Sequence, residues 1–261
     1  MFNIFYCFHF LLFAIFITRI YNKDITHLHN STVTQILADF ISLIYPRYCV
    51  GCNGSLVKGE ELLCTHCLLE LPKTDYHTNP QNSFYQKMSG RIPVKFVMAQ
   101  LKFVKESKVQ NLLHNLKYKN HPEIAVSLGR MYGQELLYRN YKNEFDIIIP
   151  VPLHKVRKRK RGYNQSEEFG KGLSEVLQIP CSDEIVKRVL KTETQTKKTK
   201  LKRWNNVSEV FQVIKPQQIH NKRILLVDDV ITTGATLEAC AKVLLEANCE
   251  EVSIACIAAA Q

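Results

Sequence analysis

The 261-residue sequence contains no internal repeat and no low-complexity linker. Solenoids and arrays of repeated modules are therefore excluded, because such folds repeat one unit along the chain. No basic residue precedes the first apolar run and no small-x-small site follows it, so we do not expect a cleavable signal peptide. The apolar content of 46% is typical of a globular protein with one large domain, or with a domain and a small module.

Acidic residues are comparatively few. The chain has 24 Asp and Glu against 35 Lys and Arg, which gives a formal net charge of +11. Such an excess of positive charge favours anionic partners, namely phosphorylated metabolites, nucleic acid or the inner face of a membrane.

The N-terminal segment is open to two interpretations. Residues 1–20 are almost entirely apolar and just long enough to span a bilayer. Arg19 and Lys23 would then keep the rest of the chain in the cytoplasm, tethered to the inner face of the membrane. Alternatively, residues 1–32 are a mis-assigned start, although the next methionine is Met88. Either interpretation predicts a cytoplasmic protein.

Four of the nine cysteines are grouped in two C-x-x-C pairs that are separated by eleven residues. Four thiolates at this spacing can close a tetrahedron around Zn²⁺ without an open position, so we predict a structural zinc site. Two disulfides are the alternative, but they require an oxidising compartment. The predicted zinc ligands are Cys49, Cys52, Cys64 and Cys67.

The rest of the chain alternates between strand and helix patterns. We assign residues 33–72 to a short helix over Ile36–Ile44 plus the zinc ribbon, and residues 90–261 to an α/β domain. The polar stretch Leu71–Gly90 is interpreted as a linker. Strands are predicted over Val94–Phe103, Asp146–Ile149, Ile185–Leu190 and Glu251–Ala259, and helices over Val109–Tyr118, Ile124–Tyr138 and Ser166–Leu177.

The stretch from Arg223 to Leu237, R-I-L-L-V-D-D-V-I-T-T-G-A-T-L, carries the strongest functional signal. Its four aliphatic residues predict a strand buried on both faces. Two carboxylates, Asp228 and Asp229, follow this strand, and then a loop of small residues leads into a helical pattern that begins at Leu237. The loop residues are Thr232, Thr233, Gly234, Ala235 and Thr236.

Strand, acidic pair, small-residue loop and helix together predict a phosphate site. Unpaired N–H groups and the helix dipole attract an anion at the helix N-terminus, and Gly234 lets the backbone approach the phosphate closely. The carboxylates can accept hydrogen bonds from sugar hydroxyls. The alternative is an ordinary strand–helix turn with a threonine cap, which leaves Asp228 and Asp229 unexplained.

Two basic segments remain. Six of the eight residues from His154 to Arg161 are basic and follow the end of a predicted core strand. We expect Lys155, Arg157 and Arg161 to bind pyrophosphate, with a solvated charge run or a nucleic-acid patch as alternatives. Residues 191–206 are polar and basic, and are either a mobile flap over the site or a surface loop.

The stretch around Asp228 and Asp229 resembles the phosphoribosyl-pyrophosphate motif of type I phosphoribosyltransferases. Together with the zinc knuckle, the chain resembles the ComF family of competence-associated proteins. Further segments that carry the resemblance are I-I-P-V-P-L-H at 148–154, R-G-Y-N-Q-S at 161–166 and R-W-N-N-V at 203–207.

The resemblance implies a type I phosphoribosyltransferase-like α/β fold, a parallel sheet of about five strands flanked by helices and preceded by a small zinc-ribbon module. It also implies that Asp228 and Asp229 hold the ribose of phosphoribosyl pyrophosphate and that the Thr232–Thr236 loop holds its 5′-phosphate. Mg²⁺ would bridge the ligand's oxygens. We expect transfer to an unknown amine or base, linked to DNA uptake, or alternatively a non-catalytic role in handling single-stranded DNA.

Overall fold

The computed structural model describes residues 40, 44–189 and 210–260. The chain divides into two compact units, residues 1–48 and residues 49–261. Most of the helix predicted over residues 36–44 lies outside the described residues, as do the apolar segment 1–32 and the basic segment 191–206. None of the helices within the described ranges combines the length and the apolar character needed to cross a membrane.

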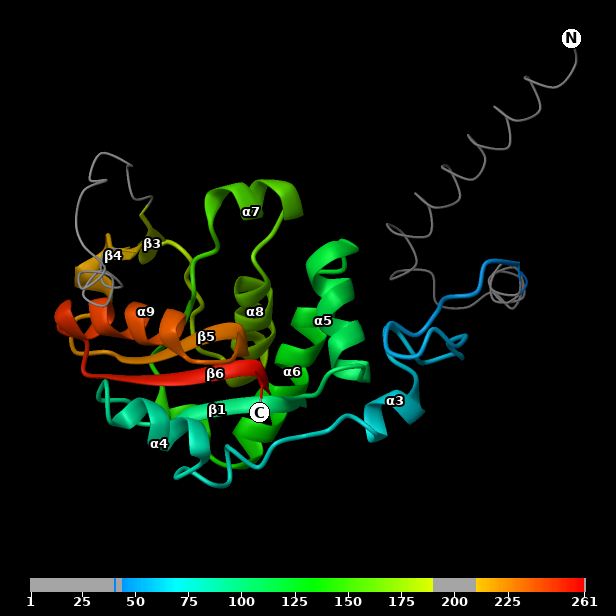
Figure 1. Cartoon of the computed structure of the whole chain (residues 1–261), viewed down its shortest axis with the longest axis horizontal. Coiled ribbons are helices and arrows are strands. Elements are labelled where there is room, and N and C mark those ends of the chain that lie inside the picture. Colours follow the sequence, from blue (N-terminus) through cyan, green and yellow to red (C-terminus); the bar gives the residue numbers. More distant parts are fainter. Residues whose placement is uncertain (1–39, 41–43, 190–209, 261) are drawn as a thin grey trace, which may run out of the picture. The chain divides into compact units, whose positions relative to one another are not determined.

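A parallel sheet of four strands forms the centre of the second unit (Figure 1). Ile224 to Val227 are fully buried, as their aliphatic sequence predicts for a strand covered on both faces. The sequence predicts about five strands. Within the described residues no fifth strand pairs with this sheet, and Cys181 forms a single isolated parallel bridge with Ile148 of the edge strand. The strand order is β1 (Val97–Phe103), β6 (Glu251–Ala260), β5 (Arg223–Ile231) and β2 (Ile147–Pro150).

Helices cover both faces of this sheet, as the alternating pattern predicts. One buried apolar cluster joins the sheet to three helices on one of its faces, and a second cluster joins it to two helices on the other face. The α/β fold expected from the sequence is therefore confirmed. The helices are α5 (Lys108–Tyr118), α6 (Glu123–Tyr138) and α8 (Gln165–Leu177) on one face, and α4 (Ser83–Ser89) and α9 (Ala235–Glu246) on the other.

Helices α6 and α8 pack with their backbones in contact. A Cβ atom added to Gly172 would lie 2.1 Å from the carbonyl oxygen of Val126, and one added to Gly129 would lie 2.3 Å from that of Phe169. Only glycine permits such a close approach. The crossing holds α8 against the sheet, and α8 begins with the polar residues Gln165 and Ser166 at the carboxyl end of the strands.

The prediction that residues 71–90 form a linker is wrong. This segment contains α4, and the side chains of Phe84 and Met88 are buried against the sheet. The Asn82 carboxamide caps the helix by accepting from the backbone of Phe84, and it donates to the carbonyl oxygen of Val97 at 2.8 Å. The segment is polar on average, but a few well-spaced large residues and one capping side chain are enough to fix it.

The remaining elements are short. The antiparallel pair of strands β3 and β4 includes the strand predicted over residues 185–190, and the basic run after β2 forms a helix, α7. These elements are α3 (Thr65–Leu69), η1 (Tyr141–Glu144), α7 (Lys155–Arg161), β3 (Val186–Arg188), β4 (Phe211–Val213) and η4 (Pro216–Gln218).

Candidate functional site

The predicted ligand-binding residues lie at the carboxyl edge of the sheet. Strands β2 and β5 are parallel neighbours, paired from Ile147 with Ile224 to Pro150 with Val227. The sequence places the acidic pair after the strand, but β5 continues to Ile231, so Asp228 and Asp229 lie within its last part, at the same edge at which the chain leaves β2 for α7. This is the edge at which open α/β sheets bind ligands.

The loop between β5 and α9 has the geometry of an anion site. Gly234 is the N-cap of α9, and its φ of +80° is one that residues with a side chain rarely adopt. Its backbone also lies close to Met88 of α4, because a Cβ at this position would be 3.3 Å from the Met88 sulfur. Helix α4 of segment 71–90 therefore packs against the loop through Met88.

This loop lines a small open cavity of about 50 Å³. The N-terminus of the twelve-residue helix α9 lies at this place, where the helix dipole favours negative charge, and the Ala235 N–H donates to the Thr233 hydroxyl at 3.4 Å. The cavity is lined by Asp228, Val230, Ile231, Thr232, Thr233, Gly234, Ala235, Thr236 and Leu237.

The two carboxylates of the acidic pair have different partners. One oxygen of Asp228 accepts from the Ser166 hydroxyl at 2.8 Å and from the backbone N–H of Asp229 at 2.8 Å. Asp229 instead forms an ion pair with Lys117 of α5, whose Nζ lies 2.8 Å from Oδ2. Three elements, α5, β5 and α8, therefore converge on the pair.

Burial raises the pKa of Asp228 to about 7, and the neighbouring Asp229 carboxylate adds to this effect. The hydrogen bonds from Ser166 and the Asp229 N–H, together with the charge of Lys117, act in the opposite direction. A carboxylate whose charged form is destabilised by burial and by a neighbouring like charge is typical of a site that binds a hydrogen-bond donor or a cation.

The three predicted pyrophosphate residues are not equivalent. Lys155 and Arg157 are exposed on α7, whereas Arg161 donates to the Gln165 side chain at 2.5 Å and lies over the ring of Tyr118. The charges of Arg157 and of Asp228 both act on the guanidinium of Arg188. Burial lowers the pKa of the Arg188 guanidinium, the charge of Arg157 lowers it further, and that of Asp228 raises it.

Sequence reasoning assigned no role to Lys117, Ser166 or Arg188. Lys117 lies 112 positions before its partner Asp229, and Ser166 lies 62 positions before Asp228. Ser166 belongs to the R-G-Y-N-Q-S segment that carries the resemblance, which was a usable signal. Nothing in the local pattern around Lys117 indicates that its side chain reaches the acidic pair.

The four cysteines of the two C-x-x-C pairs meet in one cluster, with all sulfur atoms within 4.8 Å of one another. The Cys52 and Cys64 sulfurs are 3.8 Å apart, close to the separation of about 3.8 Å that a tetrahedral zinc site requires at a Zn–S distance of about 2.3 Å. All eight cysteines in the described part of the chain are free thiols rather than disulfides.

The polar environment of the cluster also fits a metal. Cys49 accepts from the backbone N–H groups of Gly51 at 3.4 Å and Cys64 at 3.3 Å, as zinc-bound thiolates do. Burial raises the pKa of Cys49, but these N–H donors outweigh it and bring the pKa to about 6. Burial and the neighbouring sulfurs raise the pKa of Cys67 instead, so a cation is needed before all four thiols can ionise together. The cluster can hold a metal ion.

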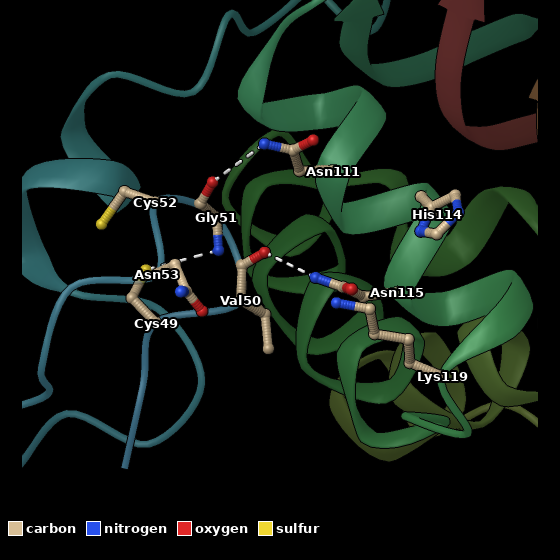
Figure 2. Close-up of a pocket in the computed structure, with 9 residues that line it drawn as sticks. All are labelled: Cys49, Val50, Gly51, Cys52, Asn53, Asn111, His114, Asn115 and Lys119. Carbon is tan, nitrogen blue, oxygen red and sulfur yellow. Dashed lines mark hydrogen bonds between the residues drawn. The ribbon is translucent and has the colours of Figure 1, made fainter. Parts of the chain in front are cut away.

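The cysteine ribbon, residues 49–67, is tied to helix α5. Figure 2 shows the carboxamides of Asn111 and Asn115 donating to the carbonyl oxygens of Gly51 and Val50, at 3.3 and 2.8 Å. A polar cavity of about 320 Å³ lies along this contact, and His114 lines it from the same helix.

Comparison with known proteins identifies relatives. Residues 114–261 match the phosphoribosyl transferase domain family. The chain is 31% identical over 218 residues to Competence protein F of Haemophilus influenzae, an alignment that covers 79% of this chain and 94% of that protein. The prediction of a phosphoribosyltransferase fold is thereby confirmed.

Two further relatives extend the comparison. Competence protein ComFC of Bacillus subtilis is 27% identical over 203 residues, which cover 73% of this chain and 81% of that protein. DNA utilization protein YhgH of Shigella flexneri is 34% identical over 149 residues, which cover 56% of this chain and 65% of that protein. The resemblance proposed from the sequence motifs is confirmed.

Proposed function

The chain belongs to the phosphoribosyl transferase domain family and, within it, to the competence-associated ComF proteins, and we propose on this basis that it binds phosphoribosyl pyrophosphate together with Mg²⁺. One observation carries the proposal. Two adjacent carboxylates, Asp228 and Asp229, lie in the last part of β5 at the carboxyl edge of a parallel sheet, and the loop after this strand leads into a glycine-capped helix N-terminus. This arrangement offers acceptors for sugar hydroxyls beside a pocket for a phosphate.

Each part of the ligand has a proposed partner. The 5′-phosphate occupies the cavity of the Thr232–Thr236 loop, where backbone N–H groups and threonine hydroxyls donate to it. The 2′- and 3′-hydroxyls of the ribose donate to Asp228 and Asp229. Ser166 holds the Asp228 side chain in place by its hydrogen bond at 2.8 Å.

The pyrophosphate is assigned to the start of α7. Lys155 and Arg157 are exposed at this edge and free to turn toward an anion, whereas Arg161 must first exchange its contact with Gln165. Mg²⁺, held mainly by ligand oxygens and water, would neutralise charge on the pyrophosphate. The cluster of Cys49, Cys52, Cys64 and Cys67 would hold Zn²⁺ in a structural role, since four thiolates leave no open position.

In the proposed transfer, an amine or base attacks the anomeric carbon of the ribose, the bond from that carbon to the pyrophosphate oxygen breaks, and pyrophosphate leaves with the electron pair. No side-chain nucleophile is needed, because the chain's residues act by positioning and electrostatics. Since phosphoribosyl pyrophosphate is a cytosolic metabolite, we place this function in the cytoplasm. A tether to the inner face of the membrane would depend on residues 1–20 alone.

Isothermal titration calorimetry of the zinc-loaded full chain with phosphoribosyl pyrophosphate tests the proposal. Binding is expected in the presence of Mg²⁺, and it should be lost in the variant Asp228→Asn with Asp229→Asn. Glu246→Gln, at the opposite end of α9 from the loop, is the matched control and should bind like the wild type. A folded wild-type protein that shows no binding with or without Mg²⁺ would refute the proposal.

A second candidate function is the handling of single-stranded DNA. Helix α7, K-V-R-K-R-K-R, exposes its basic residues from Lys155 to Lys160, and the ring of Tyr118 beneath Arg161 is 70% exposed. Exposed cations beside an aromatic ring are what single strands bind, and competence and DNA utilization occur in the names of the relatives. Binding to an oligonucleotide should then weaken steeply between 50 and 200 mM salt, on the order of 10²-fold or more. Affinity that does not change with salt would contradict this function.

A further inference from the structure

Helix α5 contacts the cysteine ribbon along one side and the acidic pair at its C-terminal end. Its ribbon-facing residues are Lys108, Asn111 and Asn115, which are three and four positions apart and so share one face of the helix. Lys108 pairs with Glu70, which follows α3 directly after the ribbon. Lys117 is turned about 200° away from Asn115 around the helix and reaches Asp229 from the other side.

The ion pair of Lys117 and Asp229 is partly shielded from water. The two side chains are 27% and 19% exposed, and the separation of Nζ and Oδ2 is 2.8 Å. Such a pair is less screened than a surface ion pair. The last turn of α5 is also fixed from a third direction, because the Tyr163 hydroxyl donates to the backbone carbonyl of Leu116. Lys117 can therefore hold the Asp229 carboxylate in one orientation.

The ribbon is part of the support for α5. Cys49 and Cys67 belong to the same buried apolar cluster as Leu112 and Leu116 of the helix. Two hydrogen bonds from Asn111 and Asn115 add to this packing (Figure 2). A ribbon of this length with four thiol ligands folds only around its metal, so the metal also fixes the surface against which α5 rests.

We propose that Lys117 is a positioning residue of the ribose site, and that the cysteine ribbon sets the position of Lys117 through Asn111 and Asn115. The inference rests on the proposed function, because it assigns a regulator to the same site. It gives the metal cluster a role in ligand binding although no cysteine touches the ligand. Disturbing the ribbon should weaken binding of phosphoribosyl pyrophosphate only as far as the loss of Lys117 itself does.

A pH profile separates positioning from general structural damage. Lys117 is one of several groups that act on the Asp228 carboxyl, and its charge lowers the pKa of that carboxyl. Without Lys117, the pH at which binding is half maximal should move upward. The other groups that face Asp228 from the packed elements are Asp229, Ser166, Arg188, Cys240 and Cys256.

The test is a double-mutant cycle on the zinc-loaded full chain, read by calorimetry with phosphoribosyl pyrophosphate and Mg²⁺. Lys117→Met and the pair Asn111→Ala with Asn115→Ala should each weaken binding about fivefold to tenfold, and their combination should be no weaker than Lys117→Met alone. Lys117→Arg keeps the cation and should retain most of the affinity. His114→Ala is the control, because His114 lines the same cavity but has no hydrogen bond to the described ribbon residues. The inference would be overturned if the losses of affinity of Lys117→Met and of the double asparagine variant multiplied in their combination. A Lys117→Met protein with wild-type affinity and an unshifted pH profile would overturn it as well.

Hydrogen exchange of the ligand-free protein provides a readout that does not depend on the proposed function. Backbone amides of residues 228–234 should exchange faster in Lys117→Met and in the double asparagine variant, and no faster in their combination. If the wild-type protein binds no phosphoribosyl pyrophosphate, the proposed function fails and this measurement alone decides the inference. Unchanged exchange in both variants would then overturn it.

Discussion

Asp228 should reduce the stability of the fold at neutral and alkaline pH, so that Asp228→Asn is more stable than the wild type. The pKa of Asp228 is raised from 3.8 to about 7 in the folded protein, first by burial and then by the Asp229 carboxylate. A raised pKa means that the folded state binds the proton more tightly than the unfolded state does. The stability that the protonated Asp228 carboxyl contributes is complete below about pH 4 and is lost as the pH rises through about 7.

The expected size follows from this shift. At about 1.4 kcal/mol per pH unit, a rise from 3.8 to about 7 corresponds to about 4 kcal/mol of lost stability, which is an upper bound. Water reaches part of the Asp228 side chain and screens its charge, so we expect about 1 to 2 kcal/mol. For a chain of this size, that amounts to about 2 to 6 °C in melting temperature. Asparagine keeps one acceptor oxygen for Ser166 and removes the charge.

The assay is thermal unfolding of the zinc-loaded protein without phosphoribosyl pyrophosphate or Mg²⁺, at several pH values from 5 to 8. The advantage of Asp228→Asn should grow over this range. Asp146→Asn is the matched control of opposite sign, because side-chain hydrogen bonds from Arg223 lower the pKa of Asp146 to about 2. The Asp146 carboxylate stabilises the fold above about pH 4. Asp146→Asn should therefore be less stable than the wild type, and this difference should be the same at pH 5 and at pH 8. An Asp228→Asn protein that is less stable than the wild type at pH 8 would show that the charged Asp228 does not destabilise the fold.

Two further predictions concern the scaffold. Gly172→Ala gains about 1 kcal/mol in helix propensity, but its Cβ would lie 2.1 Å from the Val126 carbonyl oxygen, so α6 and α8 must separate and we expect a net loss of about 2 kcal/mol in chemical denaturation. Gly90→Ala, where a Cβ meets nothing within 4 Å, should be neutral, and equal stability of the two variants would contradict this packing. Removal of the ribbon's metal with a chelator should make residues 49–67 sensitive to limited proteolysis while the far-ultraviolet circular dichroism of the sheet and helices is mostly retained. A ribbon that resists the protease equally with and without chelator would contradict a metal-dependent fold.

Most strands and helices of the α/β domain could be predicted from the sequence, because each has a recognisable pattern of apolar residues. Ile224 to Val227 form a continuous aliphatic run, and the apolar residues of α5 recur at helical spacing. The loop between β5 and α9 follows the same rule, since the residues of the strand, the two carboxylates, the glycine and the helix are close together in the chain. Local patterns of this kind determine local structure directly.

Features that depend on distant contacts could not be predicted. Residues 71–90 are polar on average, and only the tertiary contacts of Phe84 and Met88 distinguish them from a linker. The partner of Asp229 comes from a helix more than a hundred positions earlier in the chain, and no periodicity encodes that distance. The contact of the ribbon with Asn111 and Asn115 is of the same kind, because an exposed asparagine on a helix gives no sign of what it will bind.

A crystal structure of the zinc-loaded protein grown with phosphoribosyl pyrophosphate and Mg²⁺ would show whether the acidic pair and the loop bind this ligand. We expect the 5′-phosphate in the loop of Thr232 to Thr236, within hydrogen-bond distance of its backbone N–H groups, and the ribose hydroxyls on Asp228 and Asp229. We also expect the pyrophosphate to lie toward α7. Ligand density elsewhere, for example in the cavity between the ribbon and α5, with the acidic pair unoccupied, would contradict these expectations.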